Sequence, residues 1–209
     1  ASNANDVLTD FFATGAYDRN RPFFRTISPS MDILISSNLE RLIYYMSGGD
    51  AAYVNGLMED LTRDGRYEVR PDIMDAIRTL FAAGSADDDA TRAEIAACRD
   101  AHGYVLDPHT AVAVRVACDL PRTAGAKARI ILATASPYKF AADVCEALDI
   151  RADAAAPFDC MRALEDATDT AAPRPLSALE GATERFGDVI APEQMRAYVV
   201  RACKEATWE

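Results

Sequence analysis

The order of apolar and polar positions along the chain changes most sharply at residues 130–133, where four apolar residues follow one another. Such a short unbroken run is typical of a strand that is buried on both faces of a parallel sheet. Thr134 ends the run, and Ser136 followed by Pro137 predicts the start of a helix, because serine is a good N-cap and proline fits the first helical position. Open α/β sheets bind ligands at the carboxyl edge of their strands, so Thr134 and Ser136 become candidates for a binding site. An ordinary capped turn without a ligand would show the same local pattern.

Apolar residues at helical spacing fill most of the remaining chain. They predict helices over residues 7–14, 29–46, 51–63, 71–80, 87–102, 108–118 and 137–148. Short strands are predicted at residues 81–84 and 104–106. Residues 150–175 are rich in Ala, Asp and Pro and indicate mostly loop, whereas residues 176–186 and 192–203 predict two closing helices. Helices that alternate with short strands indicate an α/β fold.

The start of the predicted helix at residue 108 carries a second group of candidates. Asp107 is placed as its N-cap and Pro108 as its first residue. Between residues 111 and 118 only Arg115 is charged, which indicates a helix that is buried nearly all round. His109 therefore lies in the first turn of a buried helix. Position alone favours a histidine that is bonded to nearby backbone over a functional one.

The loop over residues 15–29 holds Arg19, Arg21 and Arg25, an unusual density of positive charge for this chain. A solvated loop held down by Phe23 and Phe24 accounts for this composition. A lid or an anion-binding loop is the alternative.

Composition narrows the classes of function. Half of the 209 residues are hydrophobic, so the chain is globular in composition, and a formal net charge of −11 argues against general binding to nucleic acid or to anionic membranes. No apolar run is long enough to span a membrane, and the polar first residues do not read as a signal peptide. The five cysteines form no CxxC pair, and Cys118 and Cys145 read as small core residues of a protein in a reducing, cytoplasmic compartment. With only two histidines, no metal site is expected.

Five stretches, taken in order, resemble threonine synthase, specifically the bacterial and fungal branch of that family. They are residues 3–6 (NAND), 26–34 (TISPSMDIL), 36–42 (SSNLERL), 107–113 (DPHTAVA) and 134–140 (TASPYKF). The resemblance covers the chain from its first residue to about residue 148 and is weaker in the tail.

The resemblance implies an α/β fold of the tryptophan-synthase β type, the fold type II of enzymes that use pyridoxal 5′-phosphate. Residues 1–150 would be the carboxyl-terminal part of the catalytic domain, and residues 151–209 an extension with two closing helices. The implied activity is that of a carbon–oxygen lyase acting on a phosphate ester. It converts O-phospho-L-homoserine and water to L-threonine and phosphate, the last step of threonine biosynthesis.

One departure from the family pattern is decisive. Family members carry the Schiff-base lysine in a Phe-Lys-Asp context in the preceding half, and Lys127, Lys139 and Lys204 lack that context here. The Ser/Gly-rich loops that cradle the cofactor phosphate are also missing. The chain is therefore expected to be the carboxyl-terminal half, with the missing amino-terminal half as its partner, and to be inactive alone. The alternative is a catalytically silent fragment, or a regulatory or interaction piece of the same fold. A third hypothesis is a threonine dehydratase-like enzyme, and the SSNLER and DPHTAVA stretches argue against it.

The family's cofactor contacts carry over onto matching positions. Thr134 matches the hydroxyl that faces the pyridine nitrogen, with Ser136 as the second choice. Asp107 and His109 are expected near the cofactor ring as positioning residues. A hydroxyl cannot hold the pyridinium charged as a carboxylate does, so the ring is expected to be a weaker electron sink, which favours elimination and replacement over transamination.

The substrate side is expected to come from two of the motifs and one lysine. The residues carried over are Ser28, Ser30, Asp32, Asn5 and Asp6. Lys139 could meet the substrate phosphate, although extension into solvent fits its position equally well.

Overall fold

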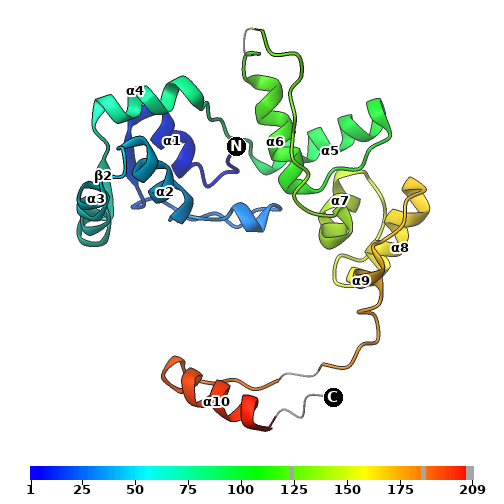
Figure 1. Cartoon of the computed structure of the whole chain (residues 1–209). Coiled ribbons are helices and arrows are strands. Elements are labelled where there is room, and N and C mark those ends of the chain that lie inside the picture. Colours follow the sequence, from blue (N-terminus) through cyan, green and yellow to red (C-terminus); the bar gives the residue numbers. More distant parts are fainter. Residues whose placement is uncertain (123–124, 185–186, 206–209) are drawn as a thin grey trace. The chain divides into compact units, whose positions relative to one another are not determined.

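The computed structural model describes residues 1–122, 125–184 and 187–205. The chain forms two compact units, residues 1–177 and 178–209, and each is described by itself (Figure 1).

The first apolar core of the larger unit is built by the amino-terminal helices. Its elements are α1 (Val7–Thr14), β1 (Ala16–Asp18), α2 (Ser37–Met46), α3 (Ala51–Asp64), β2 (Arg66–Glu68) and α4 (Pro71–Leu80). The two strands pair antiparallel with Tyr17 opposite Tyr67, and the two rings stack at 5.2 Å. Fully buried Phe11 and Ile43 lie in the same core. The four predicted helix ends after residues 14, 46, 63 and 80 are confirmed to within one residue.

The strand pair was not predicted, because each strand has three residues, too few to show a period. Each strand follows a glycine that ends a helix in the left-handed conformation, Gly15 at φ 84° and Gly65 at φ 72°. A Cβ at Gly65 would meet the side chain of Asn20, and the positive φ also favours glycine at this position.

The second core of the larger unit is built by later helices. Its elements are α5 (Asp88–His102), α6 (Pro108–Asp119), η2 (Pro137–Phe140), α7 (Ala141–Ala147), α8 (Pro157–Thr168) and α9 (Arg174–Ser177). Ile95, Val144 and Leu164 are fully buried in it. The prediction of a loop over residues 150–175 is wrong, because α8 lies there and packs on α7. The apolar side chains of α8 do recur at helical spacing, which the Ala, Asp and Pro content had masked.

The three predicted strands at residues 81–84, 104–106 and 130–133 are not formed in the structure. Outside β1 and β2, the pairing among the described residues is one parallel bridge between Ser2 and Ser85. Ile130 and Leu132 are 84% and 75% exposed, so the expectation of a buried central strand is wrong for this chain. A strand needs neighbouring strands for its backbone hydrogen bonds, and none of the described residues pairs with residues 130–133 in this way.

Two predicted helices start elsewhere. The helix expected over residues 29–46 is a single turn, η1 (Pro29–Met31), separated from α2, which begins after Ser36. The Tyr17 hydroxyl explains the break, because it donates to the Leu34 carbonyl oxygen and accepts from the Ser36 N–H, both at 2.9 Å. Of the helix expected over residues 176–186, the structure has only the end of α9; residues 178–184 are not helical, and Phe186 lies outside the described residues.

Two smaller expectations also change. Phe23 and Phe24 are about half exposed, so they do not hold their loop down. Cys145 is buried as expected, but Cys118 is exposed on the last turn of α6.

The smaller unit contains η3 (Pro192–Gln194) and α10 (Met195–Glu205), which confirms the helix predicted over residues 192–203. The predicted division at residue 150 stays a prediction about domains; in the structure, the compact units divide after Ser177. Within the described ranges, every helix is too short or too polar to cross a membrane.

Candidate functional site

The first turn of α6 is organised by one buried carboxylate. Asp107, 2% exposed, caps the helix by accepting from the backbone N–H groups of His109 at 2.9 Å and Thr110 at 3.4 Å. Its second oxygen accepts from the Thr110 hydroxyl. The sequence prediction of Asp107 as N-cap is therefore confirmed, and the carboxylate is fully engaged by local donors.

The same carboxylate fixes the ring of His109. Nδ1 of His109 lies 3.0 Å from Oδ1 of Asp107, and Nε2 lies 3.1 Å from the backbone nitrogen of Ser30, which can only donate. This network assigns the proton to Nδ1 and leaves Nε2 as the acceptor. The Phe140 ring packs on the imidazole with centroids 4.6 Å apart. His109 is thus bonded to a backbone group, as its position predicted, but that group belongs to Ser30, which is distant in the sequence.

Thr134 is attached to the same helix turn. Its backbone N–H donates to the Thr110 hydroxyl at 3.3 Å. The described residues offer the Thr134 hydroxyl itself no hydrogen-bond partner, and the residue is exposed.

These residues open onto a cleft of about 570 Å³ in the larger unit. Polar groups at its wall come from Thr134, His109, Ser30 and the charged Arg129. The remaining wall is mostly apolar and is formed by Met31, Ala82, Ala113, Val116, Ile130 and Leu132, among others. A cleft with apolar walls and a few polar groups is the usual form of a small-molecule site.

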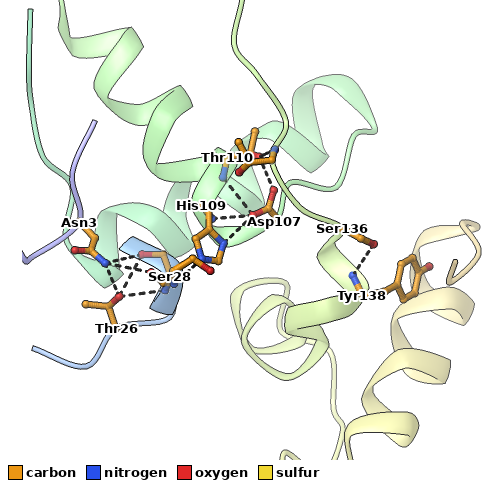
Figure 2. Close-up of polar contacts among 10 residues, drawn as sticks. Asn3, Thr26, Ser28, Asp107, His109, Thr110, Ser136 and Tyr138 are labelled. Atoms are coloured by element: carbon orange, nitrogen blue, oxygen red, sulfur yellow. Dashed lines mark hydrogen bonds and ion pairs between the residues drawn. The ribbon is translucent and has the colours of Figure 1, made fainter. Parts of the chain in front are cut away.

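A second polar cluster lies beside the first and is centred on two buried asparagines, Asn3 and Asn5. Figure 2 shows Asn3 with Thr26 and Ser28. The Asn3 amide nitrogen lies 2.8 Å from Oγ1 of Thr26, 3.0 Å from Oγ of Ser28 and 2.7 Å from Oδ1 of Asp32. The Asn5 amide nitrogen reaches the same Asp32 oxygen at 3.0 Å. The bond from Ser30 to His109 joins this cluster to α6.

Asp32 is the acceptor of this cluster. Besides the two asparagine amides, its Oδ1 accepts from the Thr26 hydroxyl at 2.7 Å, and its Oδ2 accepts from the Thr26 N–H at 3.1 Å. All of these donors are neutral, so the carboxylate is held by hydrogen bonds and not by an ion pair.

The phenol of Tyr17 in β1 is held protonated by its surroundings. Burial raises the pKa of Tyr17, and this outweighs the opposing effect of the hydrogen bond from Ser36. The hydroxyl therefore keeps the proton that it donates to the Leu34 carbonyl oxygen.

The structure brings together most, but not all, of the predicted site residues. Asp107, His109, Thr134, Ser28, Ser30, Asp32 and Asn5 belong to the two connected clusters. Asp6 instead pairs with Arg21 at 2.9 Å. Ser136 caps η2 by accepting from the Tyr138 N–H at 3.3 Å, and Lys139 is exposed with its ammonium 5.7 Å from the Phe140 ring centroid.

Three residues of the clusters were missed by sequence reasoning: Asn3, Thr26 and Thr110. Each lies inside one of the five quoted motifs, so the signal was present in the motif and was assigned to its neighbours. Among the residues that the structure describes, no group of three or more His, Cys, Asp or Glu side chains is placed to hold a metal ion.

Comparison with known proteins shows which family the chain resembles. Residues 110–199 match the family model described as threonine synthase, C-terminal. Human threonine synthase-like 1 is 37% identical over 153 residues, which are 72% of this chain and 20% of that protein. Threonine synthase of Eremothecium gossypii is 37% identical over 166 residues, 71% of this chain and 32% of that protein.

Among solved structures, the chain is similar to threonine synthase with bound pyridoxal phosphate from Brucella melitensis. The TM-score is 0.76 at 34% identity, and the match covers 99% of this chain and 40% of that one. The chain thus spans a fifth to two fifths of the length of these relatives. The predicted fold class, part of the pyridoxal-phosphate fold of threonine synthases, is confirmed by this likeness.

Proposed function

This chain belongs to the threonine synthase family as its carboxyl-terminal part, and on that premise we propose that it forms one wall of the active-site cleft of a threonine synthase. The substrate proposed is O-phospho-L-homoserine, and the products are L-threonine and phosphate. The observation that carries the proposal is the Thr134 hydroxyl at the cleft, which has no partner among the described residues.

The residues present fit pyridoxal 5′-phosphate. The cleft offers apolar side chains such as Val116 and Leu132 for the faces of a planar ring, and the Thr134 hydroxyl for its nitrogen. When bound, the cofactor would withdraw electrons from the carbon atoms next to the substrate amine.

Thr134 would donate a hydrogen bond to the ring nitrogen. Its backbone is attached through Thr110 to α6, so the hydroxyl is held at a fixed distance from that helix. An alcohol is too weak an acid to charge the ring, which favours elimination and replacement of side-chain groups over transamination. Ser136 is the second choice for this role, and its hydroxyl is already used to cap η2.

Asp107 and His109 would act as positioning residues beside the ring. Asp107 orients the imidazole through Nδ1, and the ring of Phe140 supports it from one side. His109 lines the cleft, so its imidazole would also help to exclude water from one wall.

The substrate side would be formed by the loop that contains Ser28, Ser30 and Asp32, together with Asn5 and Asp6. Ser28 is 1% exposed and bonded to Asn3, so it would act through the shape of the loop, whereas Ser30 is exposed at the cleft. Lys139 is exposed and would be free to reach a substrate phosphate.

The remaining wall of the cleft and the Schiff-base lysine would come from an amino-terminal half of the same protein. The three lysines of this chain lack the Phe-Lys-Asp context of the family, which supports this assignment. A reducing, cytoplasmic location is proposed from the cysteine content.

The test is an assay of the complete protein that contains this chain, supplied with pyridoxal 5′-phosphate and O-phospho-L-homoserine. The proposal expects release of phosphate and formation of threonine in equal amounts. A complete protein that binds the cofactor and releases neither product would support the alternative, a catalytically silent member with a regulatory or interaction role.

A further inference from the structure

The segment from Thr26 to Asp32, here called the 26–32 loop, is folded by bonds of its own, which join Thr26 to Asp32 and to Ser28. Within it, the Met31 N–H donates to the Ser28 carbonyl oxygen at 2.9 Å, and the Asp32 N–H donates to the Pro29 carbonyl oxygen at 3.1 Å. These two bonds form one helical turn but do not fix where the turn lies. Contacts from outside the loop must therefore set its place beside the cleft.

Asn3 holds the loop from one side. Its side chain is 1% exposed, and its amide nitrogen also lies 3.3 Å from the Ser28 carbonyl oxygen, in addition to the three oxygens described above. Its amide oxygen accepts from the Asn5 N–H at 2.9 Å. A backbone N–H can only donate and a carbonyl can only accept, so the orientation of the amide group is determined.

His109 holds the loop from the other side, from the first turn of α6 (Figure 2). Its Nε2 accepts from the Ser30 N–H, and Asp107 keeps it in the tautomer that can do so. Next to this bond, Met31 packs against the buried apolar cluster of Ala86, Val112 and Val116.

The contacts of Asn3 and His109 with the loop determine where Ser30 lies. Its N–H is used by His109, while its hydroxyl has no hydrogen-bond partner among the described residues and the residue is exposed in the wall of the cleft. The loop thus presents a free hydroxyl to the same cleft that receives the free hydroxyl of Thr134.

We propose that Asn3 and His109 are positioning residues that hold the 26–32 loop from its two sides, so that the Ser30 hydroxyl hydrogen-bonds the amino-acid substrate. His109 would then serve the substrate loop, through Ser30, in addition to its place near the cofactor ring. The identity of the substrate rests on the proposed function; the geometry of the loop does not.

The first experiment measures amide hydrogen exchange in the 209-residue chain. His109→Phe keeps an aromatic ring but removes the acceptor, and the Ser30 amide should exchange about 5- to 10-fold faster, the effect of losing one hydrogen bond. His109→Gln places an oxygen near the position of Nε2 and should restore most of the protection. Asn3→Ser should speed exchange of the Thr26 amide, which is bonded to Asp32.

The matched control is Thr168→Val in α8. Thr168 is also buried and hydrogen-bonded, to the Leu164 carbonyl oxygen at 2.6 Å, but it lies in the other core. It should lower stability without changing exchange at Ser30 or Thr26. Equal exchange at Ser30 in the native chain and in His109→Phe would overturn the proposal. If His109→Phe does not fold, unchanged protection of the Thr26 amide in Asn3→Ser would overturn it instead.

The second experiment measures steady-state kinetics in the complete enzyme. Asn3→Ser should raise KM about 10-fold while kcat changes by less than about 3-fold, because the loop acts on substrate binding. His109→Phe should raise KM by at least as much, and it should also lower kcat because His109 lies beside the proposed cofactor ring. Ser30→Ala should raise KM similarly, and combining it with His109→Phe should add little, since both remove the same contact. Fully additive effects on KM would contradict the proposal.

The two experiments separate the possible failures. A complete enzyme that does not use O-phospho-L-homoserine, together with the expected exchange changes, would reject the proposed function and leave the held loop standing. Normal turnover with no exchange change would reject the loop inference alone.

Discussion

The backbone N–H and the hydroxyl of Thr134 have different surroundings. The backbone N–H is bonded to Thr110, and the hydroxyl is free at the cleft. The buried Thr168 uses its hydroxyl within the protein, whereas the exposed hydroxyl of Thr134 is available to a ligand. The free hydroxyl is the reason to place Thr134 at the cofactor ring.

We predict that Thr134→Val in the complete enzyme lowers kcat/KM about 10- to 100-fold, the effect of losing a hydrogen bond to a polar ligand. Because the residue is exposed, the free energy of unfolding should change by less than about 0.5 kcal/mol. Thr134→Ser keeps the hydroxyl and is the control. Equal kcat/KM in the valine and native forms would remove Thr134 from the site.

The reactivity of the Cys145 thiol tests whether this side chain is buried. Burial, with a smaller effect of Cys160, raises the pKa of its thiol to about 11. At pH 8 the thiolate is then a fraction of about 0.001. Iodoacetamide should label the exposed Cys118 well before the buried Cys145, as followed by peptide mass mapping. Labelling of both at one rate in the folded chain would show that α7 is not packed as described.

Local chemistry could be predicted at the residue scale, and distant contacts could not. The cap of α6 by Asp107 follows from three neighbouring residues. The bond between Ser30 and His109 joins residues that are 79 positions apart, so no local pattern could reveal it. Asn3 was missed for the same reason, since its partners are 23 to 29 residues away.

At the scale of elements, helices were predicted where apolar spacing and caps agreed. Helix α5 begins at its Asp87 cap and ends before Gly103, as expected. Helix α8 was missed because its flanks are rich in Ala, Asp and Pro, although Cys160, Met161 and Leu164 show the spacing. The strands failed for another reason: strand formation depends on a neighbouring strand, which the local sequence does not describe.

The importance of α8 can be measured with Leu164→Ala. Leu164 is fully buried between α7 and α8, so the truncation should lower the free energy of unfolding by about 2–5 kcal/mol. Leu179→Ala, at a leucine that is 58% exposed, should change it by less than about 0.5 kcal/mol. Thermal or urea unfolding followed by circular dichroism gives both values. Similar small effects at the two sites would mean that α8 does not belong to the core.

Helix α7 carries a half-buried carboxylate with a predictable pH dependence. Burial raises the pKa of Asp143, and Arg92 only partly opposes this. The folded chain therefore holds this proton to a higher pH than the unfolded chain, and its stability falls as pH rises from the unfolded pKa through the folded one.

Asp143→Asn removes that titration. The variant should be more stable than the native chain at pH 7. This advantage should shrink as pH falls through the raised pKa of the folded carboxyl, and it should be gone below the pKa of the unfolded carboxyl, near about 3.9. Urea unfolding at a series of pH values measures the difference. An advantage that does not vary with pH would show that Asp143 is solvated in the folded chain.

At the scale of the whole molecule, an exposed apolar segment lies next to the cleft. Ile130 and Leu132 are largely exposed, and the backbone of residues 130–133 has no strand partner among the described residues. Such a segment tends to pair with another chain. The proposed amino-terminal half would cover it in the complete enzyme.

We predict that the 209-residue chain self-associates and that Leu132→Lys weakens this association. Val189→Lys is the matched control, because Val189 is an exposed apolar residue in the smaller unit. Sedimentation velocity over a range of concentrations measures the effect. A chain that stays monomeric, or equal loss of association in both variants, would contradict the role given to residues 130–133.

The central claim is that this chain forms only one wall of the cofactor cleft, and mapping of the Schiff-base lysine tests it most directly. The complete enzyme is loaded with pyridoxal 5′-phosphate, reduced with borohydride and digested, and the pyridoxyl-lysine is located by mass spectrometry. The account predicts a modified lysine outside residues 1–209, and no absorbance near about 410–420 nm when this chain alone is mixed with the cofactor. Modification of Lys127, Lys139 or Lys204 would contradict it.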